Sequence, residues 1–332
     1  MSRIGLAPAL QRYPWLADRA VLVHAGVLAA LLVAQLVASE YAILSLTRVM
    51  VLAVYAVGYN LLFGYAGLLS LGHAMFFAAG LYGAGLAAEH LALGAPAAFL
   101  AGIGAGLVLS ALAGLVVLRT SGVGFMIVTL MFAQAAYLTL LYLAPITRGQ
   151  DGFALKGDIR RVLLPGGLSL DLTNPAAGYN LALALLAVAV LGCLALVRSP
   201  FGRVLVAIRE NEERTRLLGY DTWANKLIAF VVSGTVAAAA GAAYALLFAN
   251  VGAELASIQY SILPLLWVLL GGAGTVLGPL LGTLLMFYLV DVASGQTHAY
   301  MLVVGAALLV LVVWFPKGLL GTLRERMAPW LP

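Results

Sequence analysis

Charged residues are scarce in this sequence, which restricts the surroundings in which the chain can fold. Only 9% of its 332 residues are Asp, Glu, Lys or Arg, whereas 64% are hydrophobic. A soluble protein of this length carries roughly a quarter charged residues. Too few charges remain here to cover a water-exposed surface, so we expect most of the chain to face lipid.

Cysteine is nearly absent too, as are the common motifs of catalysis and nucleotide binding. The lone Cys193 excludes a disulfide framework. GxxxxGK followed by Ser or Thr does not occur, so the chain does not bind ATP through a P-loop, and GxSxG, HExxH and CxxC are missing. The histidines lack metal-ligand spacing, and the scattered basic residues form no nucleic-acid stripe. We therefore expect no metal, no cofactor bound by this chain and no nucleic-acid partner.

Carboxylates are the third shortage, because none lies deep within an apolar run. Ion-coupled transporters usually need an ionisable group within the membrane to carry the coupling ion. The acidic residues nearest the membrane fall at the ends of runs or in loops: Glu40, Glu89, Glu254 and Asp291. If the protein moves a solute against a gradient, we expect the energy to come from another molecule.

Long apolar runs are what the sequence has in abundance. About 20 apolar residues are needed to cross the hydrocarbon core as a helix. We expect an all-α integral membrane protein, a polytopic helical bundle of about 8–10 transmembrane helices with glycine-broken spans. The candidate spans are 20–39, 41–63, 65–88, 95–118, 123–144, 178–197, 227–249, 257–271, 277–293 and 299–315.

Lys and Arg are distributed unevenly between the two sides that ten spans define. With the N-terminus in the cytoplasm, thirteen fall inside and only Arg148, Lys156, Arg160 and Arg161 fall outside. The positive-inside rule therefore predicts that both termini are cytoplasmic. Arg48 lies within the second span, where it either reaches the outer surface or faces the bundle interior.

Two long loops interrupt the apolar runs. The outer loop 145–177 is rich in Gly and Pro, and the inner loop is 198–226. Residues 201–219 of the inner loop have the mixed charges and apolar spacing of one short amphipathic helix that ends at Gly219. The expected parts of the chain are a cytoplasmic N-terminal segment (1–19), a transmembrane domain (20–315) and a cytoplasmic C-terminal tail (316–332).

Glycine gathers in two apolar stretches, 64–85 and 271–282. Glycine lets helices approach closely in lipid, and it lets a helix break where polar backbone lines a cavity. The sequence leaves both interpretations open. Paired broken segments in two halves point to a substrate path, although both stretches fall on the cytoplasmic side of the predicted topology. The path candidates are Asn60, Gly64, Gly67, Ser70, Gly72, His73, Gly271, Gly274 and Gly278.

His73 has a second interpretation, because a buried histidine often serves only to hydrogen-bond a neighbouring helix. Next to it, Met75, Phe76 and Phe77 could give a path an apolar lining. Such a lining would favour an aliphatic substrate.

Six stretches together resemble a known family. They are YNLLFGYAGLLSLGHAMFF (59–77), RTSGVGFMIVTLMFAQ (119–134), RGQDGF (148–153), SPFGRVLVAIRENEERTRLLGYD (199–221), LLGGAGTVLGPLLGTLL (269–285) and FPKGLLG (315–321). From about residue 45 to 321, the chain resembles the permease subunits of branched-chain amino acid ABC importers of the LivM type. The resemblance implies a multi-span permease in the bacterial plasma (inner) membrane.

The resemblance also implies partners. These are a homologous second permease, two ABC ATPase subunits that bind ATP and Mg, and an extracytoplasmic solute-binding protein. The inner loop would form a coupling helix seated in a cleft of an ATPase. The matching positions here are Gly202, Arg203, Arg209, Glu210, Asn211, Glu213 and Gly219.

The substrate implied is leucine, isoleucine or valine, moved inward. Members of this class also serve urea, short amides or other amino acids, and nothing in residues 59–85 separates these. A stand-alone secondary transporter or facilitator, which works without ATP, is the alternative from another class. An intramembrane enzyme would need polar catalytic residues at one membrane depth, and the sequence offers no such cluster.

Overall fold

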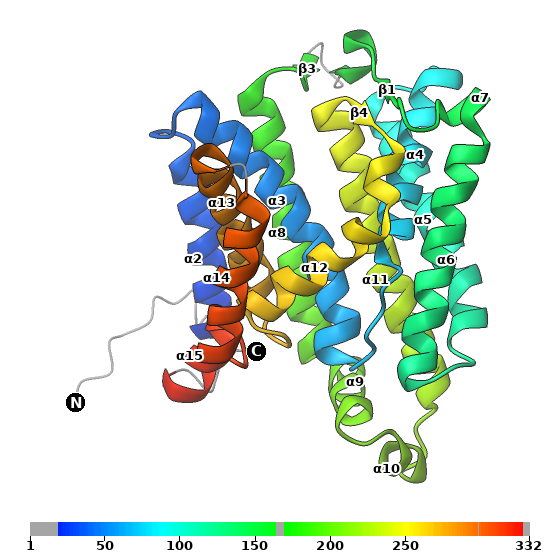
Figure 1. Cartoon of the computed structure of the whole chain (residues 1–332), viewed down its shortest axis with the longest axis vertical. Helices are drawn as coiled ribbons and strands as arrows, with labels where there is room; N and C mark the ends of the chain where they lie inside the picture. Colours follow the sequence, from blue (N-terminus) through cyan, green and yellow to red (C-terminus); the bar gives the residue numbers. More distant parts are fainter. Residues whose placement is uncertain (1–18, 164–168, 298, 328–332) are drawn as a thin grey trace, which may run out of the picture.

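The computed structural model describes residues 19–163, 169–297 and 299–327, and helices dominate this part of the chain (Figure 1). The expected N-terminal segment, apart from Arg19, and residues 328–332 of the expected tail lie outside the described residues. Ten helices overlap the ten expected spans, so the all-α, multi-span fold is confirmed. They are α2 (Arg19–Ala34), α3 (Glu40–Asn60), α4 (His73–His90), α5 (Ala95–Val117), α6 (Gly122–Tyr142), α8 (Pro175–Arg198), α11 (Thr222–Phe248), α12 (Ile258–Gly271), α13 (Gly278–Gln296) and α14 (Tyr300–Trp314).

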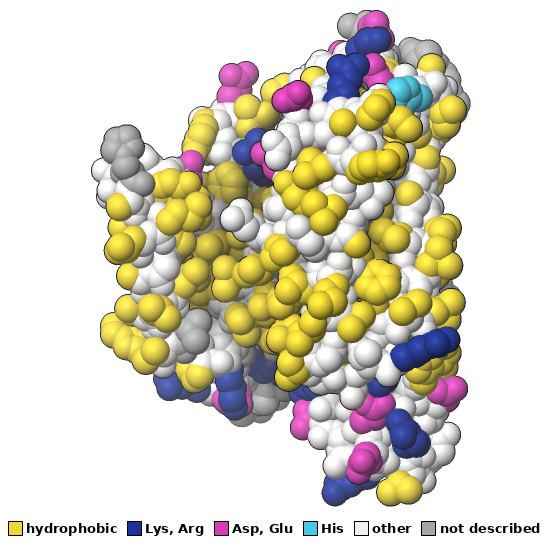
Figure 2. All heavy atoms as spheres, turned by 45° about the vertical axis from the view of Figure 1, so that its right-hand side comes forward, with side chains coloured by type: hydrophobic (Ala, Val, Ile, Leu, Met, Phe, Trp, Pro, Cys, Tyr) yellow, Lys and Arg dark blue, Asp and Glu magenta, His cyan; other side chains and the backbone are white. Residues whose placement is uncertain are grey.

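Six helical stretches among the described residues are long and apolar enough to cross a membrane. Three further apolar helices are shorter: α2, α12 and the Tyr300–Leu311 part of α14. Figure 2 shows hydrophobic side chains spread over the middle of one face, with most charged side chains near its upper and lower ends. This distribution suits a multi-pass membrane protein, whose apolar band faces lipid.

At the upper end of Figure 1, short strands secure the outer loop. This loop contains α7 (Ala144–Thr147) and the 3-10 turn η3 (Gly157–Arg160), and a second 3-10 turn, η4 (Ala253–Ala256), follows α11. Two antiparallel pairs form: β1 (Phe153–Ala154) with β4 (Asn250–Val251), and β2 (Arg161–Leu163) with β3 (Ser169–Asp171). Phe153 lies opposite Val251 in the first pair.

Two arginines lie against the end of α11. Arg160 donates hydrogen bonds to the main-chain oxygens of Leu246 (2.8 Å) and Leu247 (2.6 Å), carbonyls that the last turn of the helix leaves free. Burial lowers the pKa of Arg160, and Asp171 opposes that shift. Arg48 is exposed at the surface of this chain, with its guanidinium carbon 5.2 Å from the centroid of the Phe248 ring. The outer loop is therefore fastened to the bundle by main-chain carbonyls.

Close packing is one role of the glycines in 64–85. A Cβ atom at Gly80 of α4 would collide with main-chain atoms of Ala238 in α11. A Cβ atom at Gly102 of α5 would lie 2.5 Å from the main-chain oxygen of Gly80. Helix backbones that approach this closely gain van der Waals contact, which drives association in lipid. These glycines therefore let α4 lie tightly between α5 and α11.

Breaking the helix is the second role. The chain leaves α3 through a π-helical turn, η2 (Leu61–Tyr65), and regains a helix only at His73. The break agrees with the expected glycine-broken spans, but the helix of the span expected from residue 65 begins only at His73. Gly67 has φ +71°, a left-handed conformation that favours glycine.

Side chains from other helices satisfy the backbone freed by this break. The Leu71 N–H donates to Thr129 Oγ1 (3.1 Å), and the Ala74 N–H donates to Ser261 Oγ (2.9 Å). Non-helical backbone is tolerated at membrane depth only where such partners exist. The break is thus a stable part of the fold.

The inner loop folds as two helices, so the expectation of one helix through residues 201–219 is wrong. They are α9 (Pro200–Glu210) and α10 (Glu212–Leu217). Asn211 has extended backbone that ends α9, and its Oδ1 accepts from the Arg214 N–H (2.9 Å) to cap α10. Asn is among the preferred N-cap residues, and two glutamates in the first turn suit the positive end of a helix. Both helices lie at the lower end of Figure 1, where α15 (Leu319–Met327) also lies.

Candidate coupling site

Arg209 of α9 connects the inner loop to the first glycine stretch. Its Nη1 donates a 2.6 Å hydrogen bond to the main-chain oxygen of Gly64, and its Nη2 lies 2.7 Å from Glu210 Oε1. The aliphatic part of Arg209 lies beside Gly67, where a Cβ atom would be 2.6 Å from Arg209 Cγ. Any side chain at Gly67 would displace Arg209. The loop therefore rests directly on the helix break.

Asn60 joins the two glycine stretches. Its Nδ2 donates to the main-chain oxygen of Thr275 (2.9 Å), and its Oδ1 accepts from the Gly274 N–H (3.0 Å). Asn60 is fully buried, so both bonds replace lost contact with water. A Cβ atom at Gly64 would lie 2.5 Å from the Gly274 nitrogen. We call the group of Asn60, Gly64, Gly67, Arg209 and Gly274 the glycine junction.

The segment 315–321 closes the glycine junction from a third side. A Cβ atom at Gly318 would lie 2.5 Å from the Cα atom of Gly272, and both glycines have positive φ. Arg324 of α15 donates from Nη1 to the main-chain oxygen of Gly274 (3.0 Å). Each glycine stretch therefore has a carbonyl bound by an arginine from another helix.

The other predicted path residues lie apart from the glycine junction. The Gly72 N–H donates to Ser70 Oγ (3.2 Å), and a Cβ atom at Gly72 would collide with the main-chain oxygen of Thr129. Gly271 and Gly278 face each other where α12 ends and α13 begins, with main chain against main chain. The two stretches thus meet at one place and pack separately elsewhere.

His73 hydrogen-bonds a neighbouring helix. Its Nε2 lies 2.8 Å from Ser233 Oγ on α11. Ser233 Oγ is also 2.6 Å from the Gly58 carbonyl oxygen, so its single proton is donated there. His73 Nε2 must therefore donate to Ser233. The structure thus contains the interhelical bond that was the competing interpretation of His73.

Met75, Phe76 and Phe77 are at most 1% exposed. The Phe76 ring meets the Phe230 ring edge-on, with centroids 5.3 Å apart, and Phe77 packs against Tyr55 at 5.0 Å. These three side chains are part of the core.

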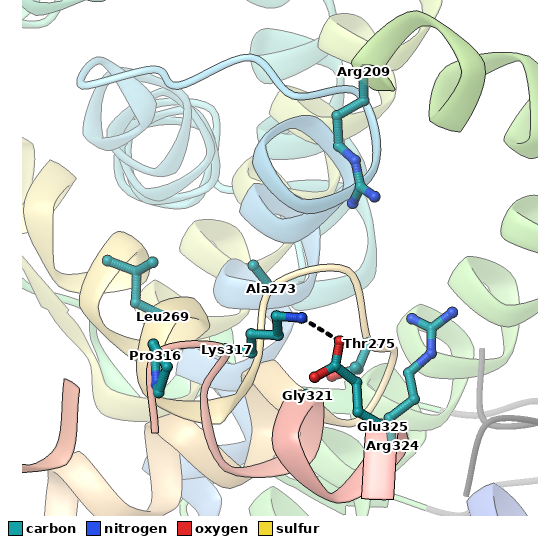
Figure 3. A pocket seen from close by; sticks show the side chains of 9 residues that line it. All are labelled: Arg209, Leu269, Ala273, Thr275, Pro316, Lys317, Gly321, Arg324 and Glu325. Carbon is teal, nitrogen blue, oxygen red and sulfur yellow. Dashed lines mark hydrogen bonds and ion pairs between the residues drawn. The ribbon is translucent and has the colours of Figure 1, made fainter. Parts of the chain in front are cut away.

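A cavity of about 530 Å³ adjoins the glycine junction (Figure 3). Its charged lining consists of Arg209, Lys317, Arg324 and Glu325, and Lys317 Nζ pairs with Glu325. In Figure 3, Arg209 reaches down from α9, and the other three approach from the opposite side. Three cations against one carboxylate leave positive charge in excess. We call this space the basic cavity.

The remaining coupling candidates are spread over the inner loop. Gly202 is buried where α9 turns away from α8, and a Cβ atom there would collide with the carbonyls of that helix. Arg203, Glu210 and Glu213 are exposed, and Gly219 follows α10 with φ +91°. Arg209 alone among the coupling candidates belongs to the glycine junction. Asn211 shapes the loop as the cap between its helices.

An ion pair anchors α10 to α11. Glu212 Oε1 lies 2.6 Å from Lys226 Nζ and 3.5 Å from Arg216 Nη2. Burial acts to raise the pKa of the Glu212 carboxyl, but the hydrogen bond and charge of Lys226 outweigh it, and the pKa falls below its ordinary value. The anchor is therefore a charged one at neutral pH.

The tip of the inner loop carries exposed apolar side chains. Leu217 is 88% exposed and Leu218 71% exposed, whereas Leu205 of α9 is fully buried. In Figure 1 the loop projects beyond the lower end of the bundle. These two leucines are therefore available to a binding partner at the tip of the loop.

Sequence reasoning missed several polar residues that hold the site together. Thr129, Ser233 and Ser261 bond main-chain or side-chain groups around α4, and Arg324 binds the second glycine stretch. A Ser or Thr inside an apolar run, close in the fold to a predicted helix break, was the available signal. For Arg324 the sequence gives only its place in a basic tail.

These features define a multi-pass helical membrane protein whose surface loop is joined to breaks in its membrane helices, as in a transport permease. Residues 41–313 match the family described as "Branched-chain amino acid transport system / permease component". The chain belongs to this family, so the resemblance noted from the sequence is confirmed.

The chain is similar to the "High-affinity branched-chain amino acid transport system permease protein LivM" of Escherichia coli (strain K12). They share 30% identity over 302 residues, 85% of this chain and 70% of the relative. The protein of the same name from Salmonella typhimurium gives the same figures. The "Autoinducer 2 import system permease protein LsrC" of Photorhabdus laumondii is 32% identical over 175 residues, 51% of this chain and 48% of the relative. No solved structure matches.

Proposed function

We propose that the chain is the transmembrane permease subunit of an ABC importer and moves branched-chain amino acids inward. Separate ATPase subunits bind ATP and Mg and supply the energy. The observation that carries this proposal is the contact between Arg209 and Gly64. It joins a projecting surface loop to a break in a membrane helix.

The projecting loop gives an ATPase a place to bind. The exposed Leu217 and Leu218 enter an apolar cleft of the ATPase, and the exposed charges of Arg203, Glu210 and Glu213 bind around its rim. When the ATPase subunits close, α10 moves with them. The Glu212–Lys226 pair and the cap at Asn211 transmit that movement to α11 and α9.

Movement of α9 shifts Arg209 and thereby the glycine junction. Asn60 belongs to the first segment and hydrogen-bonds Gly274 and Thr275 of the second, so segments 60–67 and 271–278 move together. Two packings of such a unit would open the path alternately to the outside and to the inside. Among the other path candidates, Ser70 and Gly72 lie in the helix break that follows the first segment, and His73 begins α4. Gly271 ends α12 and Gly278 begins α13, at the two ends of the second segment.

The substrate assignment rests on the relatives. The LivM proteins are named for branched-chain amino acid transport, and they cover most of this chain. The LsrC relative is named for import of autoinducer 2, so the family includes other substrates. We assign leucine, isoleucine or valine, with urea, short amides or other amino acids as alternatives.

The complete importer contains a homologous second permease, two ABC ATPases and an extracytoplasmic solute-binding protein. The chain lies in the bacterial inner membrane with both termini in the cytoplasm. This orientation places α9, α10 and α15, with their many basic residues, on the cytoplasmic side.

The test is ATP hydrolysis by this chain reconstituted in lipid with the second permease and the ATPase subunits. The binding protein is added loaded with leucine, loaded with urea, or empty. Stimulation by the leucine-loaded form alone supports the proposal, and stimulation by the urea-loaded form alone reassigns the substrate. Solute uptake by the chain alone, without ATP, would instead identify a stand-alone transporter.

A further inference from the structure

The basic cavity has more cations than its own carboxylates can pair. Lys317 is paired with Glu325, and Arg209 is paired with Glu210. Arg324 has no carboxylate partner among the described residues, and one of its N–H groups is used on the Gly274 carbonyl. A guanidinium has five N–H donors, so several remain for an anion. The space of about 530 Å³ is large enough for a phosphate-bearing group.

A second space adjoins the basic cavity across α15. This apolar groove of about 320 Å³ is lined only by Val, Leu and Met side chains of α2, α3, α13 and α15 and of Leu277, which immediately precedes α13. Leu320 and Leu323 of α15 line the groove, whereas Gly321 and Arg324 of the same helix line the basic cavity. One helix thus presents leucines to one space and a cation to the other.

We propose that α15 holds an anionic phospholipid. Its phosphate binds Arg324 and Lys317 in the basic cavity, and one acyl chain lies in the apolar groove along Leu320 and Leu323. A basic pocket beside membrane helices is the usual setting for recognition of anionic headgroups. A free phosphate would use the cavity but would leave the groove unoccupied, so the paired spaces favour a lipid.

The net charge determines which lipid binds. Phosphatidylcholine carries a quaternary ammonium beside its phosphate, and the excess positive charge that Arg324 gives the lining would repel that ammonium. Phosphatidylglycerol has the phosphate without the ammonium, so its phosphate is attracted to the lining cations and no group of the lipid is repelled.

The bound phosphate would also stabilise the glycine junction. Arg324 and Arg209 both line the basic cavity and each binds a glycine carbonyl. An anion between them offsets the repulsion of the two guanidinium groups and favours the arrangement described here.

The test is native mass spectrometry of the full chain in detergent with dioleoyl phosphatidylglycerol, dioleoyl phosphatidylcholine, or both. We expect at least one phosphatidylglycerol to remain bound at an energy that removes phosphatidylcholine. The double variant K317Q/R324Q should lose this preference about tenfold, because bonds to charged groups are lost. R326Q is the matched control: it makes the same change on the same helix, at an exposed residue that does not line the cavity. It should keep the preference.

Four results would overturn the proposal. The first is equal binding of both lipids to the unaltered chain, which needs no variant. The second is an equal effect of R326Q and the double variant on the lipid preference. Displacement of phosphatidylglycerol by millimolar inorganic phosphate would show that the site takes a free anion. If the double variant does not fold, R324Q alone is compared with R326Q, and an unchanged preference in R324Q also overturns it.

Discussion

Arg209 and Gly64 lie 145 residues apart in the chain, and Arg209 nevertheless donates a 2.6 Å hydrogen bond to the main-chain oxygen of Gly64. This carbonyl belongs to the π-helical turn through which α3 ends. π-Helical turns are frequent at functional sites, and a carbonyl of this one is bound by a residue from elsewhere in the fold. The partner here comes from the projecting loop, so loop and turn cannot move independently.

Replacing Arg209 with Gln should loosen the turn without unfolding the protein. Loss of a hydrogen bond from a charged donor costs about 1.5–3 kcal/mol, or roughly a ten- to hundredfold change in local opening. Hydrogen–deuterium exchange at Ala66 and Leu68, whose N–H groups bond within the turn, should become faster. R203Q changes an exposed arginine of the same helix and should leave these amides unchanged. Similar exchange in the two variants would show that Arg209 does not hold the turn.

Replacing Asn60 with Leu should destabilise the whole bundle. Leu fills a similar volume but leaves the Thr275 carbonyl and the Gly274 N–H buried and without their partner. Each such group costs about 1–3 kcal/mol, so we expect a loss of about 2–4 kcal/mol in unfolding free energy. N180L is the control, since Asn180 is exposed on α8 and bonds only its own helix. Equal stability of the two variants in denaturant titrations in detergent would contradict the role of Asn60.

Replacing Gly80 with Ala should lower the stability of the folded protein, whereas replacing Gly104 with Ala should raise it. A Cβ atom at Gly80 collides with the backbone of α11, so G80A forces the helices apart and costs about 1–3 kcal/mol. A Cβ atom at Gly104 of α5 meets nothing within 4 Å, so G104A gains about 0.5–1 kcal/mol from helix propensity. The thermal unfolding midpoint in detergent distinguishes them. A midpoint for G80A at or above that of the unaltered protein would exclude close packing as the role of Gly80.

The spans could be predicted from the sequence because burial in lipid depends on composition. Every expected span overlaps one helix, and the ends differ by only a few residues except at the start of α4. Hydropathy could not locate that exception, since residues 66–72 are as apolar as a continuous helix. Their break depends on Gly67 and on hydroxyl partners from α6 and α12, which lie far away in the chain.

The glycine junction could not be predicted for a similar reason. The sequence placed both glycine stretches on one side of the membrane, but not in contact. Asn60 binds main-chain atoms of Gly274 and Thr275, and main-chain atoms leave no pattern in a sequence. The break at Asn211 was different, because an Asn followed by two glutamates is a recognisable helix start. The apolar spacing across it suggested one helix instead.

The Glu212–Lys226 pair should make the stability of the inner loop depend on pH. The folded protein holds the pKa of Glu212 below its value in the unfolded chain, so folding favours the charged carboxylate. The stabilisation is fully present above the unfolded pKa, near 4.5, and is lost as the pH falls through the lower, folded value. Because the Glu212 side chain is one-third exposed, water screens the pair and the effect should be modest.

The comparison of E212Q with the unaltered protein isolates this effect. Gln can still hydrogen-bond Lys226, but it carries no charge. At pH 7, exchange of the α10 amides should be faster in E212Q than in the unaltered protein, after correction for intrinsic rates. The difference should shrink as the pH falls below 4.5 and through the lower, folded pKa of Glu212, where the native carboxylate becomes protonated as well. E213Q removes a neighbouring exposed charge that lies outside this ion pair, and it should show no such pH dependence. A constant difference between E212Q and the unaltered protein from pH 3 to 7 would mean that shape, and not charge, secures α10 to α11.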